Sequence, residues 1–143
     1  MRIWLLNVLF FIPLIPVILS LTGCSPEETG RSKALFNEGV ELSQQGKFDD
    51  AIQKYQKGLE QDPDNHEGYN LLGMAYRFKF NQLGAQKYKD KEIEAFKKAI
   101  ELEPEYWVAY KNLAASLYYQ GRKKEAVQYL EKALELQPND PEK

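Results

Sequence analysis

The sequence has 143 residues and a formal net charge of −2, which is enough chain for one domain with a modest core. A net charge this close to zero does not mark the chain as a nucleic-acid binder. A single cysteine excludes an intrachain disulfide and a cysteine-based metal cluster, whereas 28% charged and 13% aromatic residues are typical of a folded protein.

The chain begins with an apolar stretch behind a positive charge. Between Ile3 and Leu21 the only polar side chains are Asn7 and Ser20, and Arg2 and the α-amino group lie at the front. A short basic start, an apolar run and a small-residue exit are typical of a secretion signal. We therefore interpret residues 1–23 as a signal peptide.

The lone cysteine follows this stretch directly. Residues 21–24, Leu-Thr-Gly-Cys, resemble the lipobox of bacterial lipoproteins. The resemblance implies cleavage before Cys24, a diacylglycerol on its thiol, and a new amino group open to acylation, for example by palmitate. Two or three acyl chains anchor a protein stably, whereas one binds only marginally. The alternative is an uncleaved membrane helix, since about 19 apolar residues just span a bilayer, although Pro13 and Pro16 disfavour it.

Both interpretations put the rest of the chain on the extracytoplasmic side of a bacterial membrane, at a periplasmic face or the cell surface. Residues 24–31 form the lipidated cysteine and a tether, SPEETGR. Seven extended residues of about 3.5 Å each reach roughly 25 Å. We therefore expect the folded part to stay close to the membrane.

The remaining sequence repeats one pattern three times. The segments GLEQDPDN (58–65), AIELEPE (99–105) and ALELQPND (133–140) each place a proline five positions after a small residue. A common frame gives repeats at 32–65, 66–106 and 107–140, with a tail at 141–143. The first and third repeats have 34 residues, and the second is seven residues longer.

Apolar residues within each repeat recur at helical spacing and are interrupted by a turn signal. In the first repeat Leu35, Gly39 and Leu42 fall on one side of a first helix. We expect Gly46 to end this helix in a left-handed conformation and Pro63 to end the second helix. Each repeat is therefore predicted to be a helical hairpin in an all-α fold.

This pattern resembles the tetratricopeptide repeat family. The resemblance covers residues 32–140 and implies a solenoid of three stacked hairpins with a concave side. It is carried by small residues at repeat positions 8, 20 and 27 and by the proline at position 32; the small residues are Gly39, Gly73 and Ala114, then Ala51 and Ala126, then Gly58, Ala99 and Ala133.

The second repeat departs from the pattern. Glu92 replaces the small residue at position 20, and the seven extra residues fall within 77–92. If both helices share the insertion, each gains about one turn, with Gly84 as the turn between them. We expect the middle hairpin to protrude beyond its neighbours.

Five cations gather on this hairpin. They either contact an acidic partner or anionic lipid, or they form a solvated helix face with Asp90 and Glu92 interspersed; they are Arg77, Lys79, Lys87, Lys89 and Lys91.

The sequence offers no recognisable catalytic or cofactor site. His66, the only histidine, has no second ligand at helical spacing and is expected to be an exposed residue at a helix start. Gly-rich phosphate loops, nucleophile elbows and paired metal ligands are missing from the sequence. We therefore expect a protein that is not an enzyme and that holds no cofactor and no metal.

The first helix of each repeat lines the concave side in the tetratricopeptide family. The resemblance implies a binding surface for a protein or peptide partner, because aromatic and methionine side chains give large contact areas. The alternative is that some of the aligned residues, Phe78 above all, belong to the core of the lengthened hairpin. The implied partner-binding residues are Phe36, Val40, Asn70, Met74, Arg77, Lys111, Ala115, Tyr118 and Tyr119.

Some family members grip a C-terminal carboxylate with lysine, asparagine and arginine side chains. The matching positions here are Phe36, Val40, Leu71, Val108 and Asn112, and only Asn112 is of the right type. We therefore expect the groove to take an apolar strand or an amphipathic helix rather than a carboxylate-terminated chaperone tail.

A second surface is expected on the last helix. Family arrays usually close with an extra helix, whereas this sequence ends three residues after the third repeat. Val127, Leu130 and Leu134 lie where such a helix would pack, and exposed apolar stripes tend to mark interaction sites. We expect this uncapped helix to dock a partner or to form a homo-oligomer.

The sequence thus predicts a membrane-anchored adaptor or scaffold that binds a partner peptide or helix in its concave groove. By architecture alone it suits an assembly factor for a cell-envelope complex. The alternatives are a non-catalytic accessory subunit of an envelope enzyme or transport complex, and an enzyme whose site the sequence does not reveal. The partner's identity and the choice of membrane stay open.

Overall fold

The computed structural model describes residues 26–137, with side chains from residue 30 onward. Residues 26–137 form six helices and no strand, which confirms the all-α prediction. The helices are α1 (Pro26–Gln44), α2 (Phe48–Gln61), α3 (His66–Leu83), α4 (Gln86–Leu102), α5 (Trp107–Tyr119) and α6 (Lys123–Leu136). The proposed signal peptide and Cys24 lie outside the described residues. No helix in the described range is long and apolar enough to cross a membrane.

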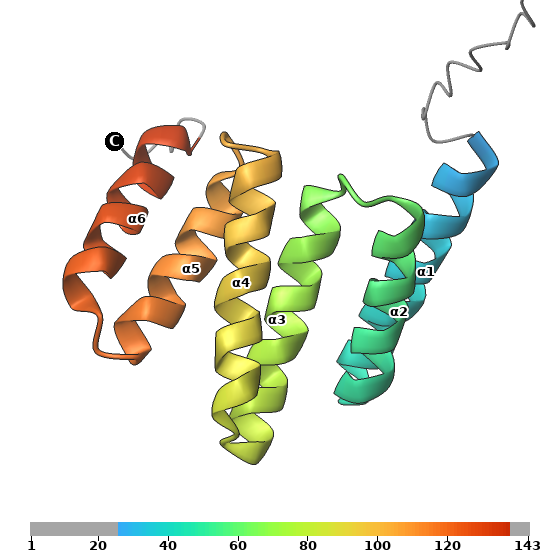
Figure 1. Cartoon of the computed structure of the whole chain (residues 1–143), viewed down its shortest axis with the longest axis horizontal. Helices are drawn as coiled ribbons and strands as arrows, with labels where there is room; N and C mark the ends of the chain where they lie inside the picture. Colours follow the sequence, from blue (N-terminus) through green and yellow to red (C-terminus); the bar gives the residue numbers. More distant parts are fainter. Residues whose placement is uncertain (1–25, 138–143) are drawn as a thin grey trace, which may run out of the picture.

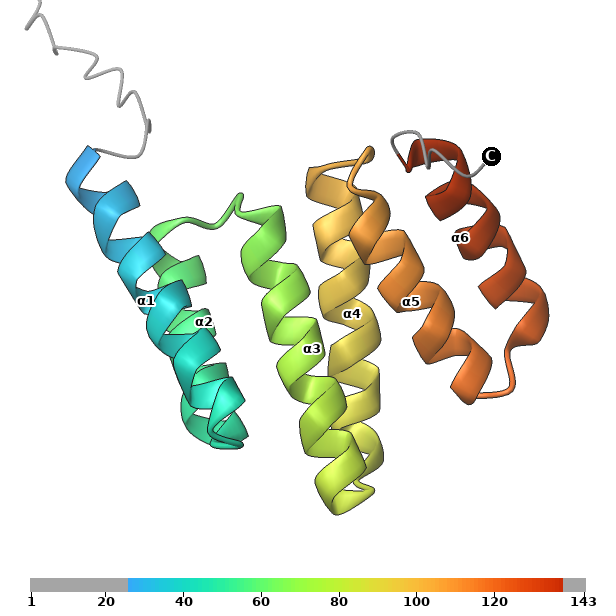
Figure 2. The same cartoon turned by 180° about the vertical axis from the view of Figure 1, so that it is seen from behind.

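The helices pair as three antiparallel hairpins that stand side by side, α1–α2, α3–α4 and α5–α6 (Figure 1). Successive hairpins meet through α2 with α3 and through α4 with α5. Seen from behind, α1, α3 and α5 lie on the near side of the stack (Figure 2). The three hairpins span residues 26–61, 66–102 and 107–136.

Glycines end the first helix of every hairpin. Gly46, Gly84 and Gly121 have positive φ values of 73°, 66° and 80°. A side chain on Cβ would clash in this left-handed conformation, so glycine is favoured there. The predicted turns at Gly46 and Gly84 are therefore confirmed.

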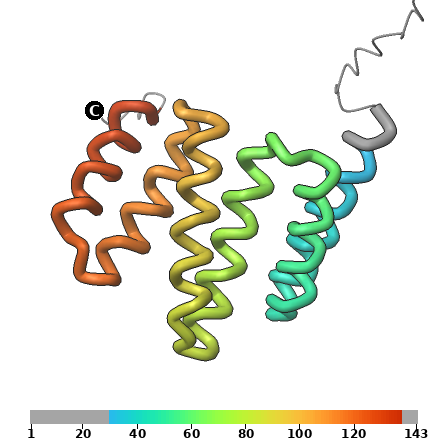
Figure 3. The backbone as a smooth tube through the Cα atoms, viewed as in Figure 1, coloured from blue at the N-terminus to red at the C-terminus, as the bar shows by residue number. Residues whose placement is uncertain are grey.

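The middle hairpin has the longest helices in the stack apart from α1, which begins early, at Pro26. The helices α3 and α4 have 18 and 17 residues, against 13 and 14 in α5 and α6. Its turn extends past the turns of both neighbours (Figure 3). The expected protrusion is confirmed.

The predicted extended tether is wrong for residues 26–31. These residues are already helical, because α1 begins at Pro26 rather than at Ser32. A proline is well tolerated in the first turn of a helix, where its missing N–H would have no partner. A helix rises only about 1.5 Å per residue, so this segment reaches much less far than an extended chain.

Small residues let aromatic rings from the second helices approach the first helices closely. A Cβ added to Gly73 would lie 2.6 Å from the ring of Phe96, which is fully buried. Gly39 faces Tyr55 at the equivalent place in the first hairpin, and Tyr55 is 2% exposed. Gly39 and Gly73 thus each make room for a large core side chain.

Candidate functional site

A groove follows the line where α1 meets α3. One hollow of about 250 Å³ is mainly apolar, and its lining includes Val40, Leu71, Met74 and Phe78. Phe78 stacks on Phe48, with ring centroids 5.1 Å apart and 10° between the ring planes. This half of the groove suits an apolar side chain of a ligand.

A second hollow continues the groove toward the start of α1. It measures about 360 Å³ and shares Val40 and Leu71 with the first hollow, so the two form one continuous groove. Its lining is more polar and includes Lys33, Asn37 and Glu67. The groove therefore changes from apolar near Met74 to polar near Lys33.

Of the two predicted site residues in α1, one lines the groove and the other belongs mainly to the core. Val40 is half-buried and lines both hollows. Phe36 is only 7% exposed and belongs to the core, although it also borders the second hollow. Its ring fills the space left by two glycines, since a Cβ on Gly58 or Gly68 would come within 2.7 Å of it.

Among the predicted site residues of α3, Met74 lines the groove and Asn70 is buried. Met74 lines the apolar hollow. Asn70 is 5% exposed, and its side-chain oxygen accepts a hydrogen bond from the Asn112 amide at 2.8 Å. Asn70 thus joins α3 to α5 and stands behind the groove surface rather than on it.

Arg77 is engaged inside the molecule. Its Nε donates to Glu92 Oε1 at 2.7 Å, and its Nη2 donates to the backbone oxygen of Asn112 at 2.7 Å and to Ser116 Oγ at 3.0 Å. Its guanidinium carbon lies 5.1 Å from the centroid of the Phe96 ring. Arg77 therefore ties α3, α4 and α5 together.

Glu92 is the fully buried centre of this network. It also accepts from Lys89 Nζ at 2.9 Å and from the hydroxyl of Ser116. Its position in the repeat is that of Ala51 and Ala126, which are 0% and 4% exposed. A carboxylate can be buried at a small-residue position here because cations and a hydroxyl surround it.

This network was not predicted from the sequence. The expectation that Lys89 and Glu92 belong to a solvated helix face is wrong, since they are 5% and 0% exposed. Lys79 is also largely buried, and it pairs with Asp49 of α2 at 2.6 Å. Lys87 and Lys91 are exposed, as that interpretation required. The available signal was a carboxylate at a position where both other repeats carry alanine.

The predicted residues of α5 lie away from the α1–α3 groove. Lys111 places its ammonium 4.9 Å from the centroid of the Trp107 ring. Ala115, Tyr118 and Tyr119 line a separate hollow of about 350 Å³ with residues of α6. Tyr119 is 83% exposed. The predicted site is thus split between two surfaces.

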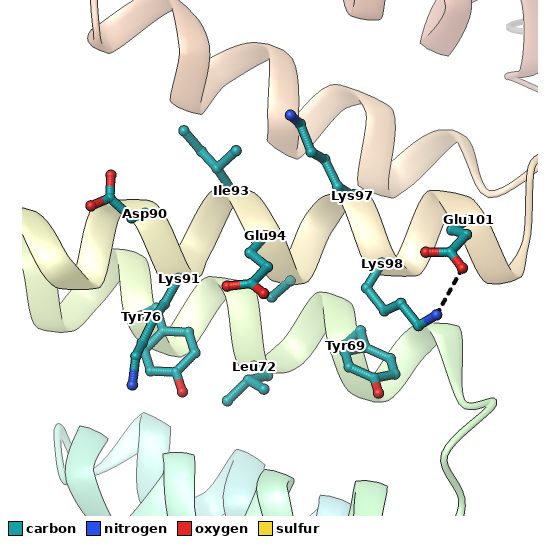
Figure 4. A pocket seen from close by; sticks show the side chains of 11 residues that line it. Tyr69, Leu72, Tyr76, Asp90, Lys91, Ile93, Glu94, Lys97, Lys98 and Glu101 are labelled. Atoms are coloured by element: carbon teal, nitrogen blue, oxygen red, sulfur yellow. Dashed lines mark hydrogen bonds and ion pairs between the residues drawn. The ribbon is translucent and has the colours of Figure 1, made fainter.

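A larger hollow of about 650 Å³ lies along α3 and α4 (Figure 4). Its apolar floor includes Leu72 and Ile93, and its rim alternates lysines with carboxylates, as in the Lys98–Glu101 pair at 2.9 Å. Exposed pairs of this kind are well solvated and contribute little. We therefore regard the α1–α3 groove as the better ligand site.

The described residues carry little that is typical of catalysis. Among residues 26–137 no group of three or more histidine, cysteine, aspartate and glutamate side chains is arranged to hold a metal ion. His66 is half-buried rather than exposed, and its ring packs edge-on against Tyr106 with centroids 4.7 Å apart. Burial raises the pKa of Tyr55, beside the groove, and hydrogen bonding to Ser43 opposes the rise.

Three stacked helical hairpins, here with a groove between α1 and α3, define an α-solenoid. The chain contains tetratricopeptide repeats: a TPR-repeat family model matches residues 39–77, and a tetratricopeptide-repeat model matches residues 107–140. Residues 78–106, which hold most of the lengthened hairpin, lie outside both matches. No curated protein sequence matches the chain.

Solved structures agree with this assignment. The first TPR of Spaghetti (RPAP3), solved with the HSP90 peptide SRMEEVD, is 28% identical with a TM-score of 0.68, and the match covers 78% of this chain and 83% of that one. MamA is 27% identical with a TM-score of 0.66, over 76% and 59% of the two chains. The Sgt2 TPR domain from Aspergillus fumigatus, 23% identical with a TM-score of 0.66 over 78% and 67%, supports the fold alone.

Proposed function

We propose that this protein is a membrane-anchored interaction adaptor that binds a peptide segment of a partner protein in the α1–α3 groove. The observation that carries the proposal is the continuity of the two hollows through Val40 and Leu71. One apolar side chain of the ligand enters beside Met74, and polar groups of the ligand meet Lys33 and Asn37 at the other end.

The class of ligand follows from the groove and from a structural neighbour. The first TPR of Spaghetti takes up a peptide, which supports a peptide ligand here. The groove of this chain is apolar at Val40 and Leu71, where some family members carry carboxylate-binding side chains. An apolar strand or an amphipathic helix therefore fits better than an acidic C-terminal tail.

Crosslinking from the groove tests this function. A photo-reactive amino acid placed at Met74 or Phe78 in the full chain should capture a partner in cells, whereas the same group at Lys97 on the outer side of α4 should not. A synthetic peptide covering the captured segment should then bind the purified chain, and Met74→Glu should weaken that binding by about tenfold or more. Equal capture from Lys97, or peptide binding that is unchanged in Met74→Glu, would overturn the proposal.

Anchoring through Cys24 is the second part of the proposal, supported by the lipobox-like residues 21–24. Lipidation confines the adaptor to the outer side of a bacterial membrane and raises the effective concentration of whatever it binds. Cys24→Ser should abolish incorporation of a labelled fatty acid and release the chain from the membrane fraction, while Ser20→Ala should do neither. Labelling that persists in Cys24→Ser contradicts the anchor.

The captured partner also separates an assembly factor from an accessory subunit of an envelope enzyme or transport complex. An assembly factor releases its partner, so the crosslink should appear only with newly made partner protein. A subunit stays bound, so the crosslink should persist in the mature complex.

A further inference from the structure

The two hollows of the α1–α3 groove differ in charge. Among the described residues no charged side chain lines the apolar hollow. Three line the polar hollow, namely Lys33 of α1, Asp62 at the end of α2 and Glu67 in the first turn of α3. Two carboxylates against one cation leave the polar hollow acidic.

Both carboxylates are accessible to a ligand. Glu67 is exposed, Asp62 is half-buried, and neither forms an ion pair within residues 30–137. Asp62 Oδ2 accepts a hydrogen bond from the Asn65 amide at 2.8 Å, which leaves its other oxygen for a ligand. A carboxylate near the groove surface can therefore pair with a cation of the ligand.

The start of α3 does not reverse this preference. Helix N-termini attract anions through their N–H groups and the positive end of the macrodipole. Here the Asn65 side chain already accepts from the N–H of Gly68 at 2.7 Å, and Glu67 places a negative charge in the same turn. Lys33 lies on the opposite wall and can donate to a main-chain carbonyl of the ligand.

The distance between the two hollows sets the spacing of ligand side chains. Glu67 and Met74 are seven residues apart on α3, which is about 10 Å along the helix. In an extended ligand, residues four apart point to the same side and are about 13 Å apart. The long, flexible side chain of a lysine or arginine takes up the difference.

We propose that the groove selects a segment in which a basic residue stands four positions from an apolar one. The apolar side chain lies beside Met74, and the basic side chain pairs with Glu67 and Asp62. An acidic side chain at the same place meets two carboxylates and is rejected. This inference rests on the proposed function and adds the chemistry of the partner.

The methyl signal of Met74 tests the preference. The chain has only two methionines, Met1 and Met74, so carbon-13 labelling of methionine methyl groups gives a reporter inside the groove. The full chain in a non-ionic detergent is titrated with acetyl-Leu-Ser-Gly-Ser-Lys-amide, with its reverse sequence, and with versions of both that carry Glu for Lys. The tighter-binding lysine peptide should have a dissociation constant about threefold or more below that of its glutamate counterpart at low salt, and high salt should reduce the difference.

Charge reversal at one residue locates the effect. Glu67→Lys leaves two cations and one carboxylate in the polar hollow, so it should reverse the preference in favour of the glutamate peptides. Glu101→Lys makes the same change of charge on α4, outside the groove, and should preserve the preference for lysine. Circular dichroism of both variants verifies that the helices are intact.

The outcomes separate this inference from the proposed function. Equal affinities, a preference for glutamate in the unchanged chain, or a preference that Glu67→Lys does not alter would overturn the inference, while groove binding would stand. The same holds if Glu101→Lys acts as strongly as Glu67→Lys. If no probe moves the Met74 signal, the inference fails; if the segment captured by crosslinking does not move it either, the proposed function fails as well.

Discussion

Replacing Glu92 with alanine should destabilise the fold, even though alanine occupies the same repeat position in both other hairpins. The reason lies in the groups that surround the carboxylate rather than in its size. Without Glu92, the ammonium of Lys89 would stay buried at 5% residue exposure without its ion-pair partner. Arg77 would lose one hydrogen bond but keep those to Asn112 and Ser116.

The magnitude can be bounded from these contacts. Removing one partner of a buried ion pair typically costs about 3–5 kcal/mol, because the other charge is left without compensation. The side chain of Arg77 is 25% exposed and can be partly solvated, so only Lys89 suffers the full loss. We therefore expect Glu92→Ala to lower the free energy of unfolding by about 3 kcal/mol, and to lower the melting temperature by roughly 10 °C.

Urea unfolding followed by circular dichroism measures this loss. Combining Glu92→Ala with Lys89→Met removes both charges and should restore most of the stability, since well-packed apolar groups often replace a buried pair without loss. Glu101→Ala, which breaks the exposed Lys98–Glu101 pair, should leave the unfolding free energy almost unchanged. If Glu92→Ala is as harmless as Glu101→Ala, or if the double variant is no more stable than Glu92→Ala, the reasoning is wrong.

Three further results are expected. Gly73→Ala should cost about 1–3 kcal/mol in chemical unfolding, because its Cβ would meet the buried Phe96 ring, whereas Gly30→Ala, which has open space around it, should cost nothing. Burial raises the pKa of Tyr55 above its ordinary value of about 10. The contribution of Tyr55 to the free energy of unfolding should therefore be complete below pH 10 and be lost as the pH rises through the native pKa. Tyr55→Phe should make the fall in unfolding free energy at alkaline pH shallower. Labelled SRMEEVD should show no saturable anisotropy change with this chain, while the first TPR of Spaghetti, solved with that peptide, serves as the positive control.

The hairpins and their turns could be predicted from the sequence because their causes are local. A glycine after an apolar period ends a helix by its own backbone preference, as Gly46 and Gly84 do. A repeated small residue reports close helix approach, which the contact between Gly73 and Phe96 confirms. Such signals need no knowledge of distant parts of the chain.

The candidate site was harder to predict because its residues depend on distant partners. Phe36 sits at a position that normally faces the groove, but it is buried because Gly58 and Gly68 leave space for its ring. From the sequence alone, Glu92 is indistinguishable from a surface charge. Its burial depends on Arg77 and Ser116, which are 15 and 24 residues away in the sequence but hydrogen-bond to it in the fold. Helical spacing can identify which residues share a side, but it does not show which of them a neighbouring helix will cover.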